Sequence, residues 1–222
     1  MSYSLDFAGL LPYLPEFIKG LKMTVTLTVI STFLGLVLGT YCAIGRMAKS
    51  KLIQGICAIY IEVVRNTPFI IQLFFIFFGL PILGLKFTAW QAGLIALVLN
   101  LGAYSAEIIR AGIDATPKGQ WEAGKTLGFS RWQVYHYIIL PPAYLRIYPA
   151  LVSQCIIVML GSAVVSQISV EELTFAANFV QSRSFLSFES YMLTALVYLL
   201  LAISMRKVFM LLKRVLFKSS VA

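Results

Sequence analysis

Ionisable side chains stand within segments that are otherwise almost free of charge. Glu62 and Arg65 lie three residues apart, and so do Glu107 and Arg110. On a helix this spacing places both members of a pair on one face. An ionisable group at membrane depth costs at least about 2.5 kcal/mol unless it is paired or wetted. These charges are therefore expected to face protein or water, where they could recognise a polar solute.

Further polar residues accompany the two pairs. Asn100, Tyr104 and Glu107 fall at helical spacing and share one face of a helix. Pro68, which closes the run Arg65-Asn-Thr-Pro68, removes an amide donor, and the backbone groups that it frees are tolerated only beside protein or a cavity. The pattern predicts a small site for a polar solute. Its candidate substrate-binding residues are Thr67, Gln72, Asn100, Tyr104, Glu107 and Ser162.

Within this site Glu107 is expected to face an ammonium group or a cationic side chain, while its polar neighbours supply hydrogen bonds. An alternative stays open, because intrahelical ion pairs can simply stabilise helix packing. That alternative is stronger for Glu62 than for Glu107. Ser162 is equally compatible with a hydrogen bond to substrate and with helix packing.

Residues 119–126 match the spelling of a phosphate-binding loop, GxxxxGK[ST]. Such a loop follows a buried strand and cradles phosphate with the amides of a flexible turn. Here Thr116-Pro117-Lys118 precedes the match, and helix-forming residues fill its middle. The only aspartates, Asp6 and Asp114, lie upstream, so no later strand supplies a magnesium-binding aspartate. We therefore expect this chain to bind no cofactor, neither ATP nor Mg.

Metal, redox and covalent chemistry are not expected. His136, the only histidine, lies among aromatic residues without a second ligand at suitable spacing, which favours a packing or interface role over a metal site. No nucleophile and base form a convincing pair, so the chain is not expected to be an enzyme. Three cysteines lie in apolar runs without CxxC spacing and are interpreted as small buried hydrophobic residues: Cys42, Cys57 and Cys155.

The composition requires a membrane. Of the 222 residues, 59% are hydrophobic and only 12% are charged, whereas about 25% are charged in an average soluble domain. These figures exclude a disordered chain, a disulfide scaffold and collagen. A net charge of +9 would suggest nucleic acid in a soluble protein. Membrane proteins, however, keep Lys and Arg in cytoplasmic loops, so the partner is the lipid bilayer and no nucleic acid is expected.

Five charge-free windows predict five membrane crossings, since about 20 apolar residues span a hydrocarbon core of about 30 Å. The second window is expected to start earlier, near Leu52. The fold class is therefore all-α, a polytopic membrane protein with a single domain over residues 1–222. Gly35 and Gly39 form a GxxxG motif, which predicts close helix packing in this chain or with a partner. The windows are 23–45, 66–85, 87–106, 147–170 and 190–205.

The Lys and Arg residues predict the orientation. With the N-terminus outside, the positive-inside rule is satisfied and the C-terminus is cytoplasmic. Only four basic residues then lie outside, namely Lys19, Lys22, Lys86 and Arg183. Residues 1–22 are expected to form an irregular interfacial segment on the outer surface, rather than a cleaved signal peptide. Residues 171–189 are expected to form a solvated outer loop, and residues 111–146 a folded cytoplasmic loop.

Residues 111–146 contain start and stop signals that predict two short helices. Thr116 is expected to cap the first helix, with Pro117 at its first position, and Gly128 to stop it. Ser130 and Gln133 spell a capping box for the second helix. Two consecutive prolines, Pro141 and Pro142, are expected to end that helix.

This loop resembles the EAA signature of the membrane subunits of ABC importers. The matching residues are Glu122-Ala123-Gly124, Gly128, Ile138, Leu140 and Pro141. Other segments resemble the branch that includes the histidine, arginine, glutamine and cystine permeases, namely Arg65-Asn-Thr-Pro68 with Gln72, Gly79-Leu80-Pro81, and residues 103–113. The resemblance extends from about Gly20 to the fifth crossing. It departs where many relatives carry Lys-Asp-Thr-Ser-Leu, because this chain has Gly161 at the position of the aspartate.

The resemblance implies a type I ABC importer permease fold in the bacterial inner membrane. It implies a coupling helix that a cytoplasmic ATPase grips, with Glu122 as a charged anchor, close approach at Ala123 and Gly124, and a turn at Gly128. The alternative for Glu122 is pairing with Lys118 and Lys125 on a solvated face. The ATPase-coupling residues would be Glu122, Ala123, Gly124, Leu127, Gly128 and Arg131.

The resemblance also implies a substrate, partners and a mechanism. The polar solute of the predicted site would be an amino-acid zwitterion. ATP and Mg would be bound by a cytoplasmic ABC ATPase dimer, substrate would arrive on an extracytoplasmic amino-acid-binding protein, and import would follow alternating access. A second permease subunit would complete the pathway. Because Gly161 replaces the aspartate, we expect that subunit to be a related rather than an identical chain. Rival hypotheses are a secondary transporter or channel subunit that works without an ATPase, and a membrane-embedded enzyme.

Overall fold

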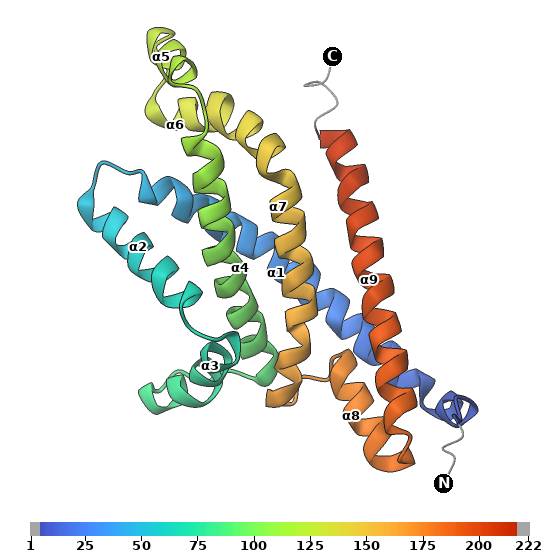
Figure 1. Cartoon of the computed structure of the whole chain (residues 1–222). Helices are drawn as coiled ribbons and strands as arrows, with labels where there is room; N and C mark the ends of the chain where they lie inside the picture. Colours follow the sequence, from blue (N-terminus) through green and yellow to red (C-terminus); the bar gives the residue numbers. More distant parts are fainter. Residues whose placement is uncertain (1–4, 217–222) are drawn as a thin grey trace.

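Residues 5–216, which the computed structural model describes, form helices and connecting loops without any strand (Figure 1). Short 3-10 and π-helical stretches join several of the α-helices. The α-helices are α1 (Leu14–Arg46), α2 (Lys51–Arg65), α3 (Phe69–Phe74), α4 (Ala89–Asp114), α5 (Lys118–Thr126), α6 (Arg131–Gln133), α7 (Leu140–Gly161), α8 (Leu173–Ser184) and α9 (Ser187–Leu216).

Four continuous helical segments are long and apolar enough to cross a membrane: Ala8–Arg46, Ala89–Asp114, Arg131–Ile168 and Ser187–Val215. A fifth crossing results if Lys51–Arg65 and Phe69–Leu83 count as one span, although they are bent by 112°. The five expected crossings are therefore confirmed in number on that count. The window 66–85 is not one straight helix, because Pro68 lacks an amide donor and adopts an extended conformation between α2 and α3.

The core of the bundle forms where α1 crosses α4. A Cβ atom added at Gly35 would lie 2.8 Å from the Leu101 side chain, and one added at Gly39 would lie 2.9 Å from the Gly102 carbonyl oxygen. The GxxxG motif thus acts within this chain, since only glycine lets the two backbones approach so closely. α4 also packs against α7, so α1, α4 and α7 form the centre of the molecule (Figure 1).

The end of the molecule that contains the start of α1 is more compact than expected. A 3-10 turn, Ala8–Tyr13, runs directly into α1, so most of the predicted interfacial segment is already part of the first long helix. Leu10 and Phe17 are buried against α8, while the remaining apolar residues of the segment are largely exposed. The two prolines confirm the expected irregularity, because Pro12 lies in the 3-10 turn and Pro15 lies in the first turn of α1.

The expectation of a solvated loop at 171–189 is wrong for two of its carboxylates. Glu172 is completely buried, where it caps α8 by accepting from the amide of Phe175 (2.8 Å) and from the Tyr198 hydroxyl (2.5 Å). Glu189 is also completely buried and accepts from the amide of Asp6 (3.0 Å). Packing of α1 and α9 against α8 removes both groups from solvent.

Pro141 and Pro142 do not end the second helix predicted for residues 111–146. The π-helical turn Val134–Ile139 leads into α7, whose first turn contains both prolines, and the rod from α6 through α7 is continuous. A proline in a first turn removes an amide that has no helical partner in any case. Thr116 is not a cap either, because its hydroxyl donates to the Gly112 carbonyl and Pro117 occupies the cap position.

The cysteines are free thiols. Cys155 is buried as expected, whereas Cys42 and Cys57 are only half-buried.

Candidate functional site

The break between α2 and α3 forms the first candidate site. Side chains of the break satisfy its backbone carbonyls: Gln72 Nε2 donates to the carbonyl oxygens of Val64 (2.7 Å) and Thr67 (2.9 Å). It also donates to the Thr67 hydroxyl oxygen (2.9 Å), and that hydroxyl donates to the Val63 carbonyl (2.8 Å). Hydrogen bonds of Gln72 and Thr67 therefore stabilise the non-helical backbone at the break, as expected where Pro68 interrupts a membrane helix.

Three polar residues on one face of α4, Asn100, Tyr104 and Glu107, lie beside this break. Asn100 Nδ2 donates to Gln72 Oε1 (3.4 Å), and the Tyr104 hydroxyl donates to the Arg65 carbonyl (3.5 Å). The Arg65 guanidinium lies over the Tyr104 ring, 5.7 Å from its centroid, and its Nη1 is 3.7 Å from Glu107 Oε2. The structure thus brings together five of the predicted substrate-binding residues, namely Thr67, Gln72, Asn100, Tyr104 and Glu107. We name these five residues with Arg65 the polar cluster.

The expected ion pairs form only in part. Glu107 receives two hydrogen bonds from Arg110, from Nε (3.2 Å) and Nη2 (3.0 Å), so this pair is confirmed. The Glu62–Arg65 pair does not form, because Arg65 turns toward Glu107 and Glu62 Oε2 accepts from Asn66 instead (3.0 Å). Glu107 consequently faces two guanidinium groups of its own chain, a difference from the expectation that it faces an ammonium group of the substrate.

Ser162 does not join the polar cluster. Its side chain is completely buried, and its hydroxyl donates to the Met159 carbonyl (2.6 Å), which is the packing role that the sequence left open. The neighbouring Gly161 faces open space, because a Cβ atom added there would meet nothing within 4 Å. A larger side chain would therefore fit at this position, where the resemblance implies an aspartate in many permeases.

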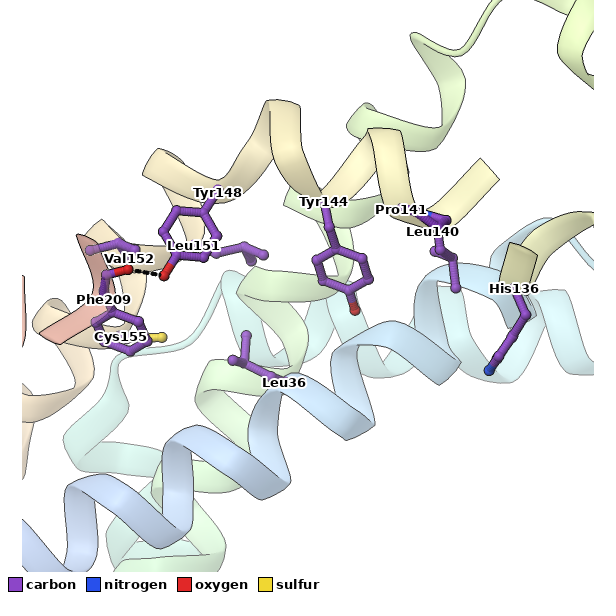
Figure 2. Close-up of a pocket in the computed structure, with 10 residues that line it drawn as sticks. All are labelled: Leu36, His136, Leu140, Pro141, Tyr144, Tyr148, Leu151, Val152, Cys155 and Phe209. Atoms are coloured by element: carbon purple, nitrogen blue, oxygen red, sulfur yellow. Dashed lines mark hydrogen bonds between the residues drawn. The ribbon is translucent and has the colours of Figure 1, made fainter. Parts of the chain in front are cut away.

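Two cavities lie away from the polar cluster. One of about 460 Å³ lies between α1, α7 and α9 and is lined by largely apolar residues (Figure 2). The Tyr148 hydroxyl donates to the Phe209 carbonyl across it, and His136 lies at one end. A second, of about 620 Å³, lies between α1 and α9. Neither is lined by residues of the polar cluster, so these cavities are not the predicted substrate site.

The loop of α5 and α6 forms the second candidate site. It projects beyond the ends of α4 and α7 at one end of the molecule (Figure 1). Glu122 and Ala123 are exposed, and Leu127 is 70% exposed. Across residues 5–216, Glu122 has no carboxylate-to-amine contact within 4.0 Å, so the alternative of pairing with Lys118 or Lys125 is wrong. The carboxylate of Glu122 and the apolar side chain of Leu127 are thus both accessible at the surface of the loop.

The remaining loop residues have structural roles. Gly124 is buried rather than available to a partner, since an added Cβ atom would lie 2.8 Å from Ile138 and 3.0 Å from Val134. Gly128 adopts a φ of 75°, which confirms the predicted turn and explains the glycine. The Ser130–Gln133 capping box is confirmed. Arg131 Nη2 donates to the Met47 carbonyl (2.9 Å) and so ties the loop to the end of α1.

Aromatic residues of the loop were missed as contact candidates. Phe129, Trp132 and Tyr137 are exposed, whereas Trp121 packs edge-on against Tyr135 with ring centroids 4.9 Å apart. Their signal in the sequence is the presence of large apolar side chains in a hydrophilic loop, where solvent exposure is unfavourable unless a partner covers them.

The family is decided by comparison with known proteins. Residues 35–218 match the model of the binding-protein-dependent transport system inner membrane component. The chain belongs to this family. These proteins are permease subunits of ABC importers and are not themselves enzymes, which confirms two expectations and favours the importer over the transporter or channel without an ATPase.

Individual members of the family are similar over most of their length. A probable amino-acid ABC transporter permease protein of Bacillus subtilis, YckA, is 38% identical over 83% of this chain and 81% of its own. The glutamine transport system permease protein GlnP of Escherichia coli is 34% identical over 89% of this chain and 91% of its own. The arginine transport system permease protein ArtQ of Bacillus subtilis is 33% identical over 90% of this chain and 92% of its own.

Solved structures agree with this assignment. The crystal structure of an amino acid ABC transporter with histidines matches 96% of this chain and 99% of its own, with a TM-score of 0.85 and 38% identity. An inward-facing structure of the MetNI methionine ABC transporter matches 90% of this chain and 97% of its own, with a TM-score of 0.68 and 21% identity. The second likeness shows the fold alone. The chain is therefore a multi-pass inner-membrane permease that works with an ATPase and a substrate-binding protein.

Proposed function

We propose that this permease subunit imports a polar amino acid or a close analogue by alternating access. The observation that carries the proposal is the polar cluster at the break between α2 and α3, which places hydrogen-bonding and charged groups among apolar helices. Such groups are costly at membrane depth unless they serve packing or a polar solute. The relatives' names support an amino acid, because they include glutamine and arginine permeases.

The α5–α6 loop would couple transport to ATP hydrolysis. Glu122 and Leu127 are exposed at its projecting end and would enter a groove of the ATPase, together with Ala123. Gly124, Gly128 and Arg131 would act indirectly, because they hold the loop in shape and attach it to α1. ATP and Mg would be bound by the ATPase dimer alone, since the segment that spells a phosphate-binding loop is the helix α5.

The proposed orientation places the α5–α6 loop and the end of α9 in the cytoplasm, with α8 and the start of α1 outside. In support, the loop and the end of α9 lie at the same end of the molecule, and α8 lies at the other (Figure 1). The outer end would receive the extracytoplasmic amino-acid-binding protein. A second permease, related rather than identical, would complete the complex, because Gly161 leaves space where a relative's aspartate would stand.

The coupling role is tested by Glu122→Lys. Reversing the charge of an exposed anchor is expected to lower co-purification of the ATPase by at least about tenfold, while membrane insertion of the permease stays normal. Glu16→Lys, the same charge change at the outer end of the molecule, is the matched control and should leave co-purification unchanged. Equal recovery of the ATPase with wild type and Glu122→Lys would remove the coupling role from this loop face.

A further inference from the structure

The charges of the polar cluster are not equally available to a ligand. Glu107 already accepts two hydrogen bonds from Arg110, and the Arg110 Nη1 atom donates in turn to Asp114 Oδ2 (2.7 Å). Arg110 is therefore held at both ends by carboxylates. Opposite charges paired by short, charge-assisted hydrogen bonds have little capacity left for a further ion.

Arg65 is held much more loosely. Among residues 5–216 its guanidinium has one ionic contact, 3.7 Å from Glu107, which is longer than a hydrogen bond. Its side chain is 39% exposed, and the Tyr104 ring lies beneath it. Several N–H groups of a planar guanidinium fork thus remain for a ligand, and this fork matches a carboxylate with two parallel hydrogen bonds.

The backbone fixes where that fork stands. Arg65 is the last residue of α2, and its own carbonyl accepts from the Tyr104 hydroxyl (3.5 Å), which ties the end of α2 to α4. Thr67 and Gln72 hold the chain immediately after it through the hydrogen bonds described above. The guanidinium is consequently presented between Glu107 and the Tyr104 ring, from a backbone that is fixed on both sides of Arg65.

The acid of the polar cluster offers no comparable opening for an ammonium group. Glu107 pairs with Arg110 and lies 3.7 Å from Arg65, and the nearby Asp114 also pairs with Arg110. Glu62 lies outside the polar cluster, where it is exposed and accepts from Asn66. The polar cluster thus presents to a solute a cation with one weak ionic contact and neutral amides, whereas its one acid is already paired.

We infer that Arg65 binds the α-carboxylate of the transported amino acid, and that Glu107 is a positioning residue that orients Arg65 between substrate molecules. This inference rests on the proposed function and deepens it, because it makes the carboxylate the obligatory feature of the substrate. Solutes that carry the ammonium group without the carboxylate should not be accepted. Selection among side chains would then come from other parts of the complex.

The test measures binding to the purified complex of both permeases and the ATPase in detergent, without the extracytoplasmic binding protein. Probes are glutamine, arginine and histidine, each compared with its α-amide, in which the carboxylate is blocked. Wild type is expected to bind at least one amino acid at least about tenfold more tightly than its amide. Arg65→Gln should weaken binding of the amino acid to the affinity of its amide. Arg65→Lys should retain part of the wild-type preference for the acid over the amide.

Two further variants separate recognition from folding. Arg183→Gln removes an exposed guanidinium on α8 and should keep the wild-type preference. Glu107→Gln should weaken binding of the amino acid but leave binding of the amide near the wild-type value, and part of the preference for the acid should persist because Arg65 remains. ATPase co-purification reports assembly of every variant.

The inference is overturned if Arg65→Gln or Arg65→Lys assembles and still prefers the acid as wild type does, or if Glu107→Gln alone abolishes that preference. Failure of the proposed function looks different, because the wild-type complex would then bind none of the amino acids.

Discussion

At the scale of the residue, Glu172 illustrates how burial changes the behaviour of a carboxylate. Burial raises the pKa of Glu172 above its ordinary value, although the Tyr198 hydroxyl and backbone amides oppose the shift. The folded protein therefore holds this proton more tightly than the unfolded chain does. It follows from linkage that the fold gains stability as the pH falls through the interval between the ordinary and the raised pKa, and loses it as the pH rises through that interval.

Glu172→Gln should remove this pH dependence, because an amide can still cap α8 but does not ionise. The expected result is a thermal midpoint that falls less than that of wild type between pH 5 and pH 8, by about 2–4 °C for each kcal/mol involved. Thermal unfolding of the purified complex measures it. Glu171→Gln, at the exposed neighbour, is the control and should follow wild type. Parallel profiles for Glu172→Gln and wild type would contradict the assignment.

Local rules predicted some residues of the site and could not predict others. The turn at Gly128 and the Ser130–Gln133 capping box follow from backbone preferences within a few residues, so the sequence was sufficient. The face shared by Asn100 and Tyr104 follows from the period of one helix. In contrast, the burial of Gly124 and the partner of Arg65 depend on which helices meet, and no local pattern contains that information.

At the scale of the element, the crossing of α1 and α4 depends on Gly39. An added Cβ atom would lie 2.1 Å from Ser105 Oγ and 2.9 Å from the Gly102 carbonyl oxygen, so part of the obstacle is backbone that must shift. Gly39→Ala is therefore expected to destabilise the permease by about 1–3 kcal/mol. Thermal unfolding in detergent should show a lower midpoint than wild type.

Gly55→Ala is the matched control for that substitution, because a Cβ atom at Gly55 in α2 would meet nothing within 4 Å. Replacing glycine by alanine there should leave stability unchanged or raise it by up to about 1 kcal/mol through helix propensity. If the two variants unfold at the same temperature, close packing at Gly39 does not hold α1 against α4.

The long helices could be predicted from the length of the apolar windows, whereas the helix ends near prolines could not. The long helices follow from apolar windows, because a membrane requires about 20 such residues. Proline has two opposite readings: Pro68 separates α2 from α3, whereas Pro141 and Pro142 begin α7 within a continuous rod. The π-helical turn Val134–Ile139 leads directly into α7 and so places Pro141 and Pro142 in a first turn, and hydrophobic periodicity does not reveal such a turn.

At the scale of the whole molecule, α9 is almost uncovered. Only 6% of its most apolar window is buried, compared with 56% in α4, and the cavity of about 620 Å³ lies between its C-terminal half and α1. Lipid can solvate such a face, but a helix that forms few contacts in its own chain is poorly positioned for a transport cycle. We expect the second permease to cover the exposed face of α9.

Disulfide or bis-maleimide cross-linking in membranes tests this arrangement. The native thiols Cys42, Cys57 and Cys155 are first replaced by serine or alanine, and single cysteines are then introduced into both permeases. Leu200→Cys, on the exposed face of α9, should yield a cross-linked permease pair. Ile59→Cys, equally exposed on α2 on the far side of α4, should yield none (Figure 1). Cross-linking through α2 but not through α9 would place the second permease on the opposite face, because reaction requires the two thiols to meet within the assembled complex.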